Sequence, residues 1–143
     1  MLHLKQAPRS RESMRILIVD DDETNRLVAR LLMERRGHDI TEAESGPTAV
    51  QALSDEEFDL VLMDLSMPGM DGFETVQSYR SASKHLPQIP IIALTAHNTA
   101  DDRARSLAAG MNGLIGKPLK VASIEYAIEV IQNRGEFDHQ RLI

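Results

Sequence analysis

Residues 15–24 read RILIVDDDET, an apolar run that ends abruptly in the four acids Asp20, Asp21, Asp22 and Glu23. The continuous, β-branched start is typical of a strand that is covered on both faces. Two carboxylates about 4 Å apart repel each other by about 4 kcal/mol at an effective dielectric constant of about 20. Solvent, a helix N-terminus or a bound cation must therefore compensate the charge of these acids.

The next segment, NRLVARLLMERRG (25–37), has the pattern of a helix. Leu27, Leu31 and Leu32 recur at helical spacing, and the segment ends on Gly37, a residue typical of helix C-termini. The acids therefore stand between a predicted strand and a predicted helix, which together form a first βα unit.

Short apolar runs and amphipathic stretches alternate along the rest of the chain. Gly110 and Gly135 are the expected ends of the last two helices. Alternation of five strands with five helices predicts an α/β fold in which a parallel sheet is wrapped on both faces. Further strands are predicted at 38–44, 58–64, 90–96 and 112–116, and further helices at 46–56, 72–82, 99–110 and 121–135.

The chain has 143 residues and is 42% hydrophobic, which fits one globular domain with a single core. Its formal net charge of -6 and its scattered basic residues argue against direct nucleic-acid binding. No apolar run reaches membrane-spanning length and there is no cysteine, so we expect a cytoplasmic domain without membrane contact. Order is expected at 14–135, with a disordered tail or linker at 1–13 and a C-terminal tail at 136–143.

Chemically active side chains stand where several predicted strands end. Taken singly, each has an ordinary structural role, because acids cap helices, threonine favours strands and lysine is usually solvated. In an open parallel sheet, however, ligands bind at the carboxyl ends of the strands. Together these groups predict a hard-cation site suited to Mg²⁺, with an amine and a hydroxyl able to bind phosphoryl oxygens. They are Asp20 and Asp21 after the first strand, Asp64 after the third, Thr95 after the fourth and Lys117 after the fifth.

Four motifs carry a family resemblance: ILIVDDD (16–22), LVLMDLSMPGMDG (60–72), PIIALTA (90–96) and GKP (116–118). With these motifs in this order and at this spacing, the chain from about Arg15 to Arg134 resembles the response-regulator receiver domains of two-component signal transduction. The resemblance implies a flavodoxin-like (βα)5 three-layer sandwich whose five-stranded parallel sheet has the order 2-1-3-4-5.

The resemblance also assigns roles to individual residues. Asp64 would accept a phosphoryl group from a phosphohistidine of a histidine kinase or a histidine phosphotransfer domain. Asp20, Asp21 and Asp64 would bind Mg²⁺ together with the backbone carbonyl of Ser66. The phosphorylated domain would then relay the signal by a conformational change.

Thr95 and Lys117 would contact the phosphoryl group, and the Lys117–Pro118 bond is expected to be cis, as in similar proteins. One position departs from the family: Leu114 stands where receivers commonly carry a Tyr or Phe that reorients when the threonine moves. A leucine supplies no planar ring, so the mechanism of readout through the fourth helix, fifth strand and fifth helix stays open. A homodimer through this same face is compatible with the resemblance.

A second hypothesis comes from a different class of protein. DDDET also fits the D-x-D-x-T pattern of haloacid-dehalogenase-like Mg²⁺-dependent phosphatases, in which Asp20 would be the nucleophile and Asp22 a general acid or base. Such enzymes usually add an acidic pair after the lysine, whereas Asp101 and Asp102 precede Lys117. A third hypothesis, a pseudo-receiver that only binds partners, is weakened because no phosphorylation residue is missing.

The sequence says less about whether the domain stands alone or belongs to a larger protein. The segment GEFDHQRLI (135–143) is too short for an output domain. No histidine lies in a recognisable kinase phosphorylation motif, so the phosphodonor is expected on another chain or another domain. The chain is either a single-domain regulator or a piece of a hybrid sensor kinase, and the ALTAH and AAGM segments slightly favour the second.

Overall fold

The computed structural model describes residues 13–86 and 88–133, and within this part of the chain five strands alternate with five helices, as predicted. The predicted tails lie outside the described residues except for Ser13, and so does the helix end predicted at Gly135. None of the described helices is both long and apolar enough to span a membrane. The elements are β1 (Arg15–Val19), α1 (Glu23–Glu34), β2 (Asp39–Ala43), α2 (Gly46–Asp55), β3 (Leu60–Asp64), α3 (Gly72–Ala82), β4 (Ile91–Thr95), α4 (Ala100–Ala109), β5 (Gly113–Gly116) and α5 (Val121–Asn133).

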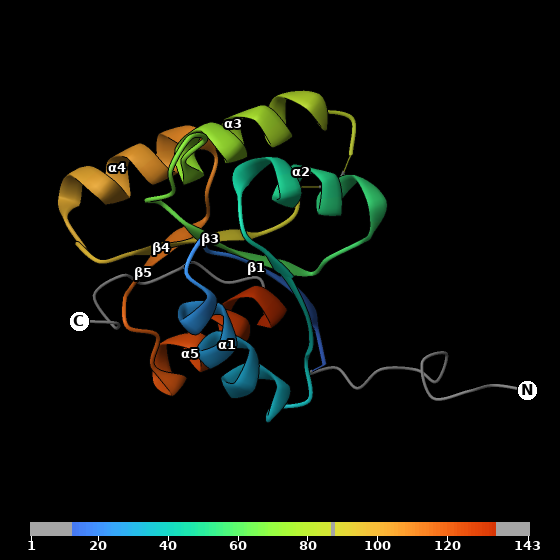
Figure 1. Cartoon of the computed structure of the whole chain (residues 1–143), viewed down its shortest axis with the longest axis vertical. Coiled ribbons are helices and arrows are strands. Elements are labelled where there is room, and N and C mark those ends of the chain that lie inside the picture. The colour runs from blue at the N-terminus through green and yellow to red at the C-terminus, as the bar shows by residue number, and fades with distance from the viewer. Residues whose placement is uncertain (1–12, 87, 134–143) are drawn as a thin grey trace, which may run out of the picture.

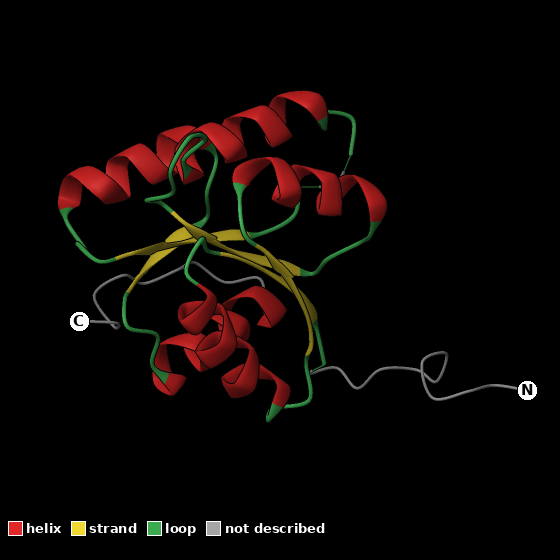
Figure 2. Ribbon diagram, viewed as in Figure 1, coloured by secondary structure: helices red, strands yellow, loops and turns green. Residues whose placement is uncertain are grey.

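The strands form one sheet between two layers of helices (Figure 2). All pairings in the sheet are parallel and the order is β2-β1-β3-β4-β5, which confirms the order implied by the resemblance. In the centre of the sheet, Leu17 of β1 pairs with Val61 of β3, and Val19 pairs with Met63. The chain leaves β1 toward β2 on one side and later returns to β3 on the other side. Strand order therefore reverses at β1 and β3, and the carboxyl ends of these two strands are where a ligand site is expected.

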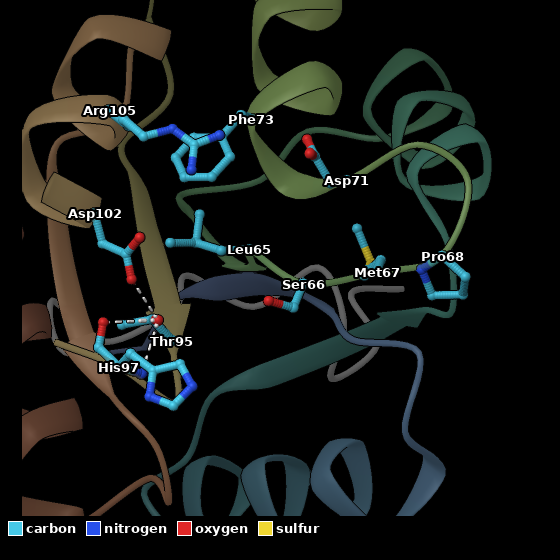
Figure 3. Close-up of a pocket in the computed structure, with 10 residues that line it drawn as sticks. All are labelled: Leu65, Ser66, Met67, Pro68, Asp71, Phe73, Thr95, His97, Asp102 and Arg105. Carbon is cyan, nitrogen blue, oxygen red and sulfur yellow. Dashed lines mark hydrogen bonds between the residues drawn. The ribbon is translucent and has the colours of Figure 1, made fainter. Parts of the chain in front are cut away.

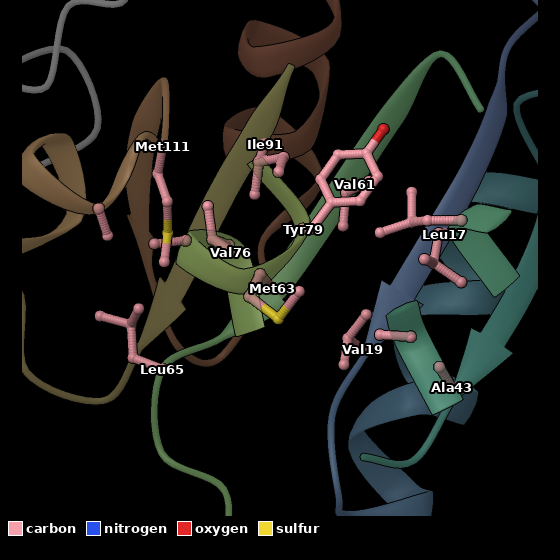
Figure 4. Packing of buried hydrophobic residues seen from close by; sticks show 14 of the residues in the cluster. Leu17, Val19, Ala43, Val61, Met63, Leu65, Val76, Tyr79, Ile91 and Met111 are labelled. Atoms are coloured by element: carbon pink, nitrogen blue, oxygen red, sulfur yellow. The ribbon is translucent and has the colours of Figure 1, made fainter. Parts of the chain in front are cut away.

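Helices α1 and α5 cover one face of the sheet, and α2, α3 and α4 cover the other (Figure 1). Alternate side chains of β1 serve the two layers, with Ile16 and Ile18 in the core beside α1 and α5. Leu17 and Val19 belong to the opposite core, which Figure 4 shows at close range. Each of these buried side chains stabilises the fold by about 1.5–3 kcal/mol. Burial on both faces explains why the strands read as continuous apolar runs.

Local signals set the ends of the helices. Asp71 and Glu74 form a capping box at the start of α3, in which each side chain accepts the other residue's backbone N–H. Gly37 follows α1 with φ of 86°, and Gly110 ends α4 with φ of 102°. Glycine adopts this left-handed conformation without strain. Gly110 therefore ends α4 as predicted, whereas the C-cap of α1 is Arg35 and Gly37 lies in the turn just beyond it.

Of the three leucines that indicate α1 in the sequence, only Leu32 packs against the core, where it is partly buried. Leu27 and Leu31 are 42% and 49% exposed, whereas the buried residues of α1 are Ala29 and Met33. Leu27, Val28 and Leu31 form an exposed apolar surface that we call the α1 stripe. Apolar surface of this kind often marks a site of interaction.

Candidate functional site

Three of the side chains singled out in the sequence meet at the carboxyl ends of β1, β3 and β5. Asp20 directly follows β1, Asp64 is the last residue of β3 and Lys117 directly follows β5. Both carboxylates are buried, with 2% of each residue exposed. The Lys117 ammonium bridges them, since its Nζ lies 3.1 Å from Asp20 Oδ2 and 3.0 Å from Asp64 Oδ1. The fold thus brings a cation between two buried acids.

The two buried carboxylates differ in how their oxygens are used. Asp20 Oδ1 accepts the Asp22 backbone N–H at 2.9 Å, and its Oδ2 faces Lys117. Asp64 Oδ1 accepts the Ser66 backbone N–H at 3.1 Å and also faces Lys117. Within the described part of the chain, the buried Oδ2 of Asp64 has no hydrogen-bond partner. Because a buried acceptor without a partner is costly, this oxygen is suited to an incoming ligand.

Burial has the largest effect on the Asp64 carboxyl and raises its pKa to about 6. Hydrogen bonds from Lys117 and Ser66 lower this pKa, while the neighbouring charge of Asp20 raises it further. Burial also lowers the pKa of Lys117, but hydrogen bonds and charge pairing with both acids outweigh burial and raise it. The Lys117 ammonium therefore stays charged, and Asp64 takes up a proton as the pH falls through about 6.

Asp20, Asp21 and Asp64 form a group able to hold a metal ion, because one oxygen from each lies within 4.8 Å of the others. Asp21 is exposed, so the group is open to solvent on one side. Carboxylate oxygens are preferred ligands of Mg²⁺, and oxygens of three carboxylates converge here. The donor set therefore fits Mg²⁺. The predicted use of the Ser66 carbonyl as a further ligand stays a prediction.

The four consecutive acids have separate roles. Asp22 is the N-cap of α1 and accepts two backbone N–H groups of the first turn, at 2.8 and 3.1 Å. Glu23 lies in the first turn, where the helix dipole favours an acid. Asp20 is paired with Lys117, and Asp21 remains exposed. A helix N-terminus, a lysine and solvent thus share the compensation of their charge.

This arrangement disagrees with the phosphatase hypothesis. Asp20, its proposed nucleophile, has both carboxylate oxygens engaged, one by a backbone N–H and one by Lys117. Asp22, its proposed acid or base, caps α1 through Oδ1. The buried oxygen without a partner belongs to Asp64 instead.

Thr95 ends β4 and is buried, and its hydrogen bonds join it to the loop and helix that follow. Its Oγ1 lies 3.0 Å from Asp102 Oδ2 and 3.1 Å from the His97 carbonyl oxygen, and it accepts the His97 N–H at 3.0 Å (Figure 3). Sequence reasoning treated Asp102 only as an acid that precedes Lys117 and missed this contact. The available signal was an acid in the first turn of the helix that follows the strand of Thr95.

A cavity of about 530 Å³ opens beside Thr95, between the loop after β3 and helix α4 (Figure 3). Ser66 and Thr95 line it from the strand ends, and Asp102 and Arg105 line it from α4. The Arg105 guanidinium stacks over the ring of Phe73, 4.1 Å from its centroid. The cavity therefore links the strand ends to the first two turns of α4.

The loop between β3 and α3 fits tightly against the strand end that carries Asp64. Met67 is buried in the core. A Cβ atom at Gly72 would collide with the Asp64 carbonyl oxygen and would lie 3.0 Å from Leu65 Cα. Gly72 therefore allows α3 to start directly against β3.

Two expectations concern the end of the sheet at β5. The Lys117–Pro118 bond is cis, as predicted. Leu114 is buried in the core on the side of α3 and α4, in the same cluster as Val76 and Met111. The residue in the usual aromatic position thus contributes to packing.

Known proteins are similar to this chain in sequence. Residues 16–129 match the family model of the response regulator receiver domain. The chain is 40% identical over 114 residues to Sensor protein GacS of Pseudomonas syringae pv. syringae, a match that covers 78% of this chain and 13% of that protein. It is 35% identical over 124 residues to Chemotaxis protein CheY-3 of Vibrio cholerae, which covers 86% of this chain and 95% of that one. The chain thus spans a small part of the sensor protein and nearly all of CheY-3.

Solved structures have the same fold. A putative response regulator from Chloroflexus aurantiacus matches with a TM-score of 0.77 at 28% identity, covering 85% of this chain and 99% of that chain. The receiver domain of Ssk1 from Saccharomyces cerevisiae, solved with the histidine phosphotransfer protein Ypd1, matches in fold with a TM-score of 0.79 at 24% identity, covering 89% and 94%. These matches support the receiver interpretation and not the phosphatase alternative. The chain belongs to the family of response regulator receiver domains.

Proposed function

We propose that Asp64 accepts a phosphoryl group from a phosphohistidine and is the residue through which this receiver domain carries its signal. The observation behind the proposal is the buried Asp64 Oδ2, which has no partner in the described part of the chain. A carboxylate is a nucleophile that can form an acyl phosphate. Lys117, 3.0 Å from the other oxygen of Asp64, supplies positive charge beside the attacking atom.

In the proposed reaction, Asp64 Oδ2 attacks the phosphorus of the phosphohistidine. The new O–P bond forms as the N–P bond breaks, and the imidazole nitrogen leaves with the electron pair. The Ser66 backbone N–H holds the other Asp64 oxygen, and Lys117 neutralises charge on a transferring oxygen. Mg²⁺ bound by Asp20, Asp21 and Asp64, with the Ser66 carbonyl, would supply additional neutralisation of the phosphoryl oxygens.

The proposed phosphodonor is a histidine kinase or a histidine phosphotransfer domain. Ssk1, whose receiver domain shares this fold, was solved in complex with the histidine phosphotransfer protein Ypd1. The α1 stripe offers such a donor an apolar surface close to the site, because α1 begins at Glu23, directly after the acids. A donor that docks there would bring its histidine to the ends of β1 and β3. A cytoplasmic location, as expected from the sequence, stays part of the proposal.

A homodimer through α4, β5 and α5 also stays a proposal. Leu107 of α4 is 55% exposed and is a side chain that such an interface would bury. Sedimentation equilibrium of the wild type and of Leu107→Ser tests this surface. A concentration-dependent dimer that the substitution weakens supports it, and a wild type that is monomeric at every concentration contradicts it.

Intact-protein mass after incubation with acetyl phosphate tests the assignment of Asp64. The expected product is the wild type with one added phosphoryl group, formed only when Mg²⁺ is present. Asp64→Asn should remain unlabelled, and Asp20→Asn should be labelled slowly because it weakens the metal site. Asp55→Asn, at the exposed end of α2, removes the same charge away from the site and should be labelled like the wild type.

Three results would overturn the proposal. Labelling of Asp64→Asn at the wild-type rate would place the acceptor elsewhere. Phosphate release that depends on Asp20 and not on Asp64 would revive the phosphatase hypothesis. A wild type that forms no adduct with acetyl phosphate or with a phosphorylated histidine phosphotransfer protein would indicate a pseudo-receiver.

A further inference from the structure

The hydroxyl of Thr95 has one proton and two acceptors within reach. Asp102 Oδ2 lies 3.0 Å from Thr95 Oγ1, and the His97 carbonyl oxygen lies 3.1 Å away. A carboxylate is the stronger acceptor, because hydrogen bonds to charged groups are roughly twice as strong as those between neutral groups. The His97 N–H already donates to the same oxygen at 3.0 Å. The Thr95 proton is therefore directed to Asp102, a residue of α4.

We propose that Asp102 is a positioning residue that holds the Thr95 hydroxyl until a phosphoryl group on Asp64 takes it over. This inference rests on the proposed function of Asp64. A hydroxyl can donate only one proton, so donation to a phosphoryl oxygen requires that the bond to Asp102 be broken. Asp102 and the phosphoryl group thus compete for Thr95, and Asp102 weakens phosphoryl binding by the strength of its own hydrogen bond.

The position of Asp102 connects this competition to α4. Asp102 lies in the first turn of the helix, and its backbone N–H donates to the Thr99 side chain that caps α4. Release of Thr95 leaves the Asp102 carboxylate without its hydroxyl donor, so the first turn of α4 loses this hydrogen bond to the end of β4. Leu114 offers no aromatic ring that could report the movement of Thr95. The Thr95–Asp102 bond supplies a direct link from the site to α4 instead.

The simpler view is that Asp102 only complements the helix dipole. Asp101, its neighbour in the same first turn, carries the same charge and lies exposed. Asp101→Ala is therefore a matched control for Asp102→Ala, because both substitutions remove one acid from the same turn. Only Asp102→Ala removes the acceptor of Thr95.

The test is a titration of the full 143-residue chain with beryllofluoride in the presence of Mg²⁺. Beryllofluoride stands in for a phosphoryl group on a carboxylate, and the Ser66 and Lys117 amide signals in NMR spectra report its binding. Removal of a hydrogen bond to a carboxylate should tighten binding by about tenfold in Asp102→Ala. Asp101→Ala should stay within about twofold of the wild type. Equal affinities for Asp102→Ala and Asp101→Ala would overturn the inference.

Loss of an acid near the site also strengthens anion binding through charge alone, and a double-mutant cycle separates this effect. In a Thr95→Val background there is no hydroxyl to release. The gain from Asp102→Ala should therefore fall to less than about twofold in that background. A tenfold gain that persists without the hydroxyl would assign the effect to charge and would refute a role through Thr95.

A measurement on the chain without beryllofluoride decides the inference even if Asp64 is not the acceptor. Three-bond couplings give the χ1 rotamers of Thr95, which should be a single rotamer in the wild type and in Asp101→Ala. Asp102→Ala should show a lower population of that rotamer, because Oγ1 then keeps only its hydrogen bonds to His97. A single unchanged rotamer in Asp102→Ala contradicts the inference, whereas a wild type that does not respond to beryllofluoride contradicts the proposed function of Asp64.

Discussion

The two ends of the sheet differ in how completely their polar groups are paired. At the amino end, the Arg15 N–H donates to Asp59 Oδ2 at 2.8 Å, and the Met14 N–H donates to His38 Nδ1 at 3.0 Å. At the carboxyl end, Asp64 keeps a buried oxygen without a partner in the described residues, and burial raises its pKa to about 6. The amino end is arranged for stability, while the carboxyl end keeps a group in an unfavourable state that a ligand can relieve.

This difference can be measured as the free energy of unfolding. Removal of a satisfied group at the amino end should destabilise the chain, as most substitutions do. Removal of the buried charge of Asp64 at the carboxyl end should stabilise the chain. The sign of the change therefore distinguishes the two ends better than its size.

The largest effect is expected from Gly72→Ala, which tests how tightly the carboxyl end is packed. The new Cβ would collide with the Asp64 carbonyl oxygen, a backbone atom that cannot move without shifting β3. Urea denaturation should show a loss of about 3 kcal/mol or more. Gly37→Ala is the control: its φ of 86° strains an alanine, but its Cβ would meet no atom within 4 Å. Equal losses for both variants would mean that the close approach of α3 to β3 is not rigid.

Asp64→Asn should change stability in the opposite direction. The pKa of Asp64 is about 6 in the folded chain against an ordinary value of 3.8, so its favourable contribution exists below pH 3.8 and is lost as pH rises through 6. An asparagine has no charge to bury. At pH 7 and without Mg²⁺, the variant should therefore be more stable by about 2–3 kcal/mol, since one pKa unit corresponds to about 1.4 kcal/mol.

Urea titrations of this variant and the wild type at several pH values provide the check. The advantage of Asp64→Asn should shrink steadily as the pH falls from 7 to 4. Asp55→Asn, an exposed acid of α2, should show no comparable gain at pH 7. A destabilised Asp64→Asn at pH 7 would mean that the ion pair with Lys117 outweighs burial.

The fold was predictable because its physical causes are local or repeated. Central strands buried on both faces read as continuous apolar runs, and glycines such as Gly37 and Gly110 mark helix ends. The order of the strands was not contained in these patterns and came only from the resemblance. The buried face of α1 was also not evident, because the small Ala29 packs inside while the larger Leu27 and Leu31 lie exposed.

The site was predictable to the extent that it depends on where strands end. Parallel strands bring their carboxyl ends to one edge of the sheet, so Asp20 and Asp64, on the neighbouring strands β1 and β3, had to lie close together once the order was known. Lys117 reaches them from β5 across β4 through its long side chain. The partner of Thr95 could not be predicted in this way. Asp102 is seven residues further along the chain, and the path of the intervening loop decides whether the two meet.

Mg²⁺ should reduce the unfavourable contribution of the carboxyl end to the free energy of unfolding. A cation bound to the acids stabilises the folded chain by about 1.4 kcal/mol when its concentration is ten times the dissociation constant. Thermal unfolding with MgCl2, compared with NaCl at equal ionic strength, measures this gain. The gain should be smaller in Asp64→Asn, and it should fall as the pH drops below 6, where protons compete for Asp64. Equal gains in the wild type and in Asp64→Asn would place the cation away from Asp64.

The smallest effect is expected at the amino end, from Asp59→Ala. The substitution removes the acceptor of the Arg15 N–H and should destabilise the chain by about 1 kcal/mol in urea denaturation. Asp59→Asn keeps an oxygen at the same place and should lose less. Mg²⁺ should leave both losses unchanged, because this end lies opposite the acids. A loss that depends on Mg²⁺ would show that the two ends are coupled through the sheet, and the separation of stability from function along the strands would then fail.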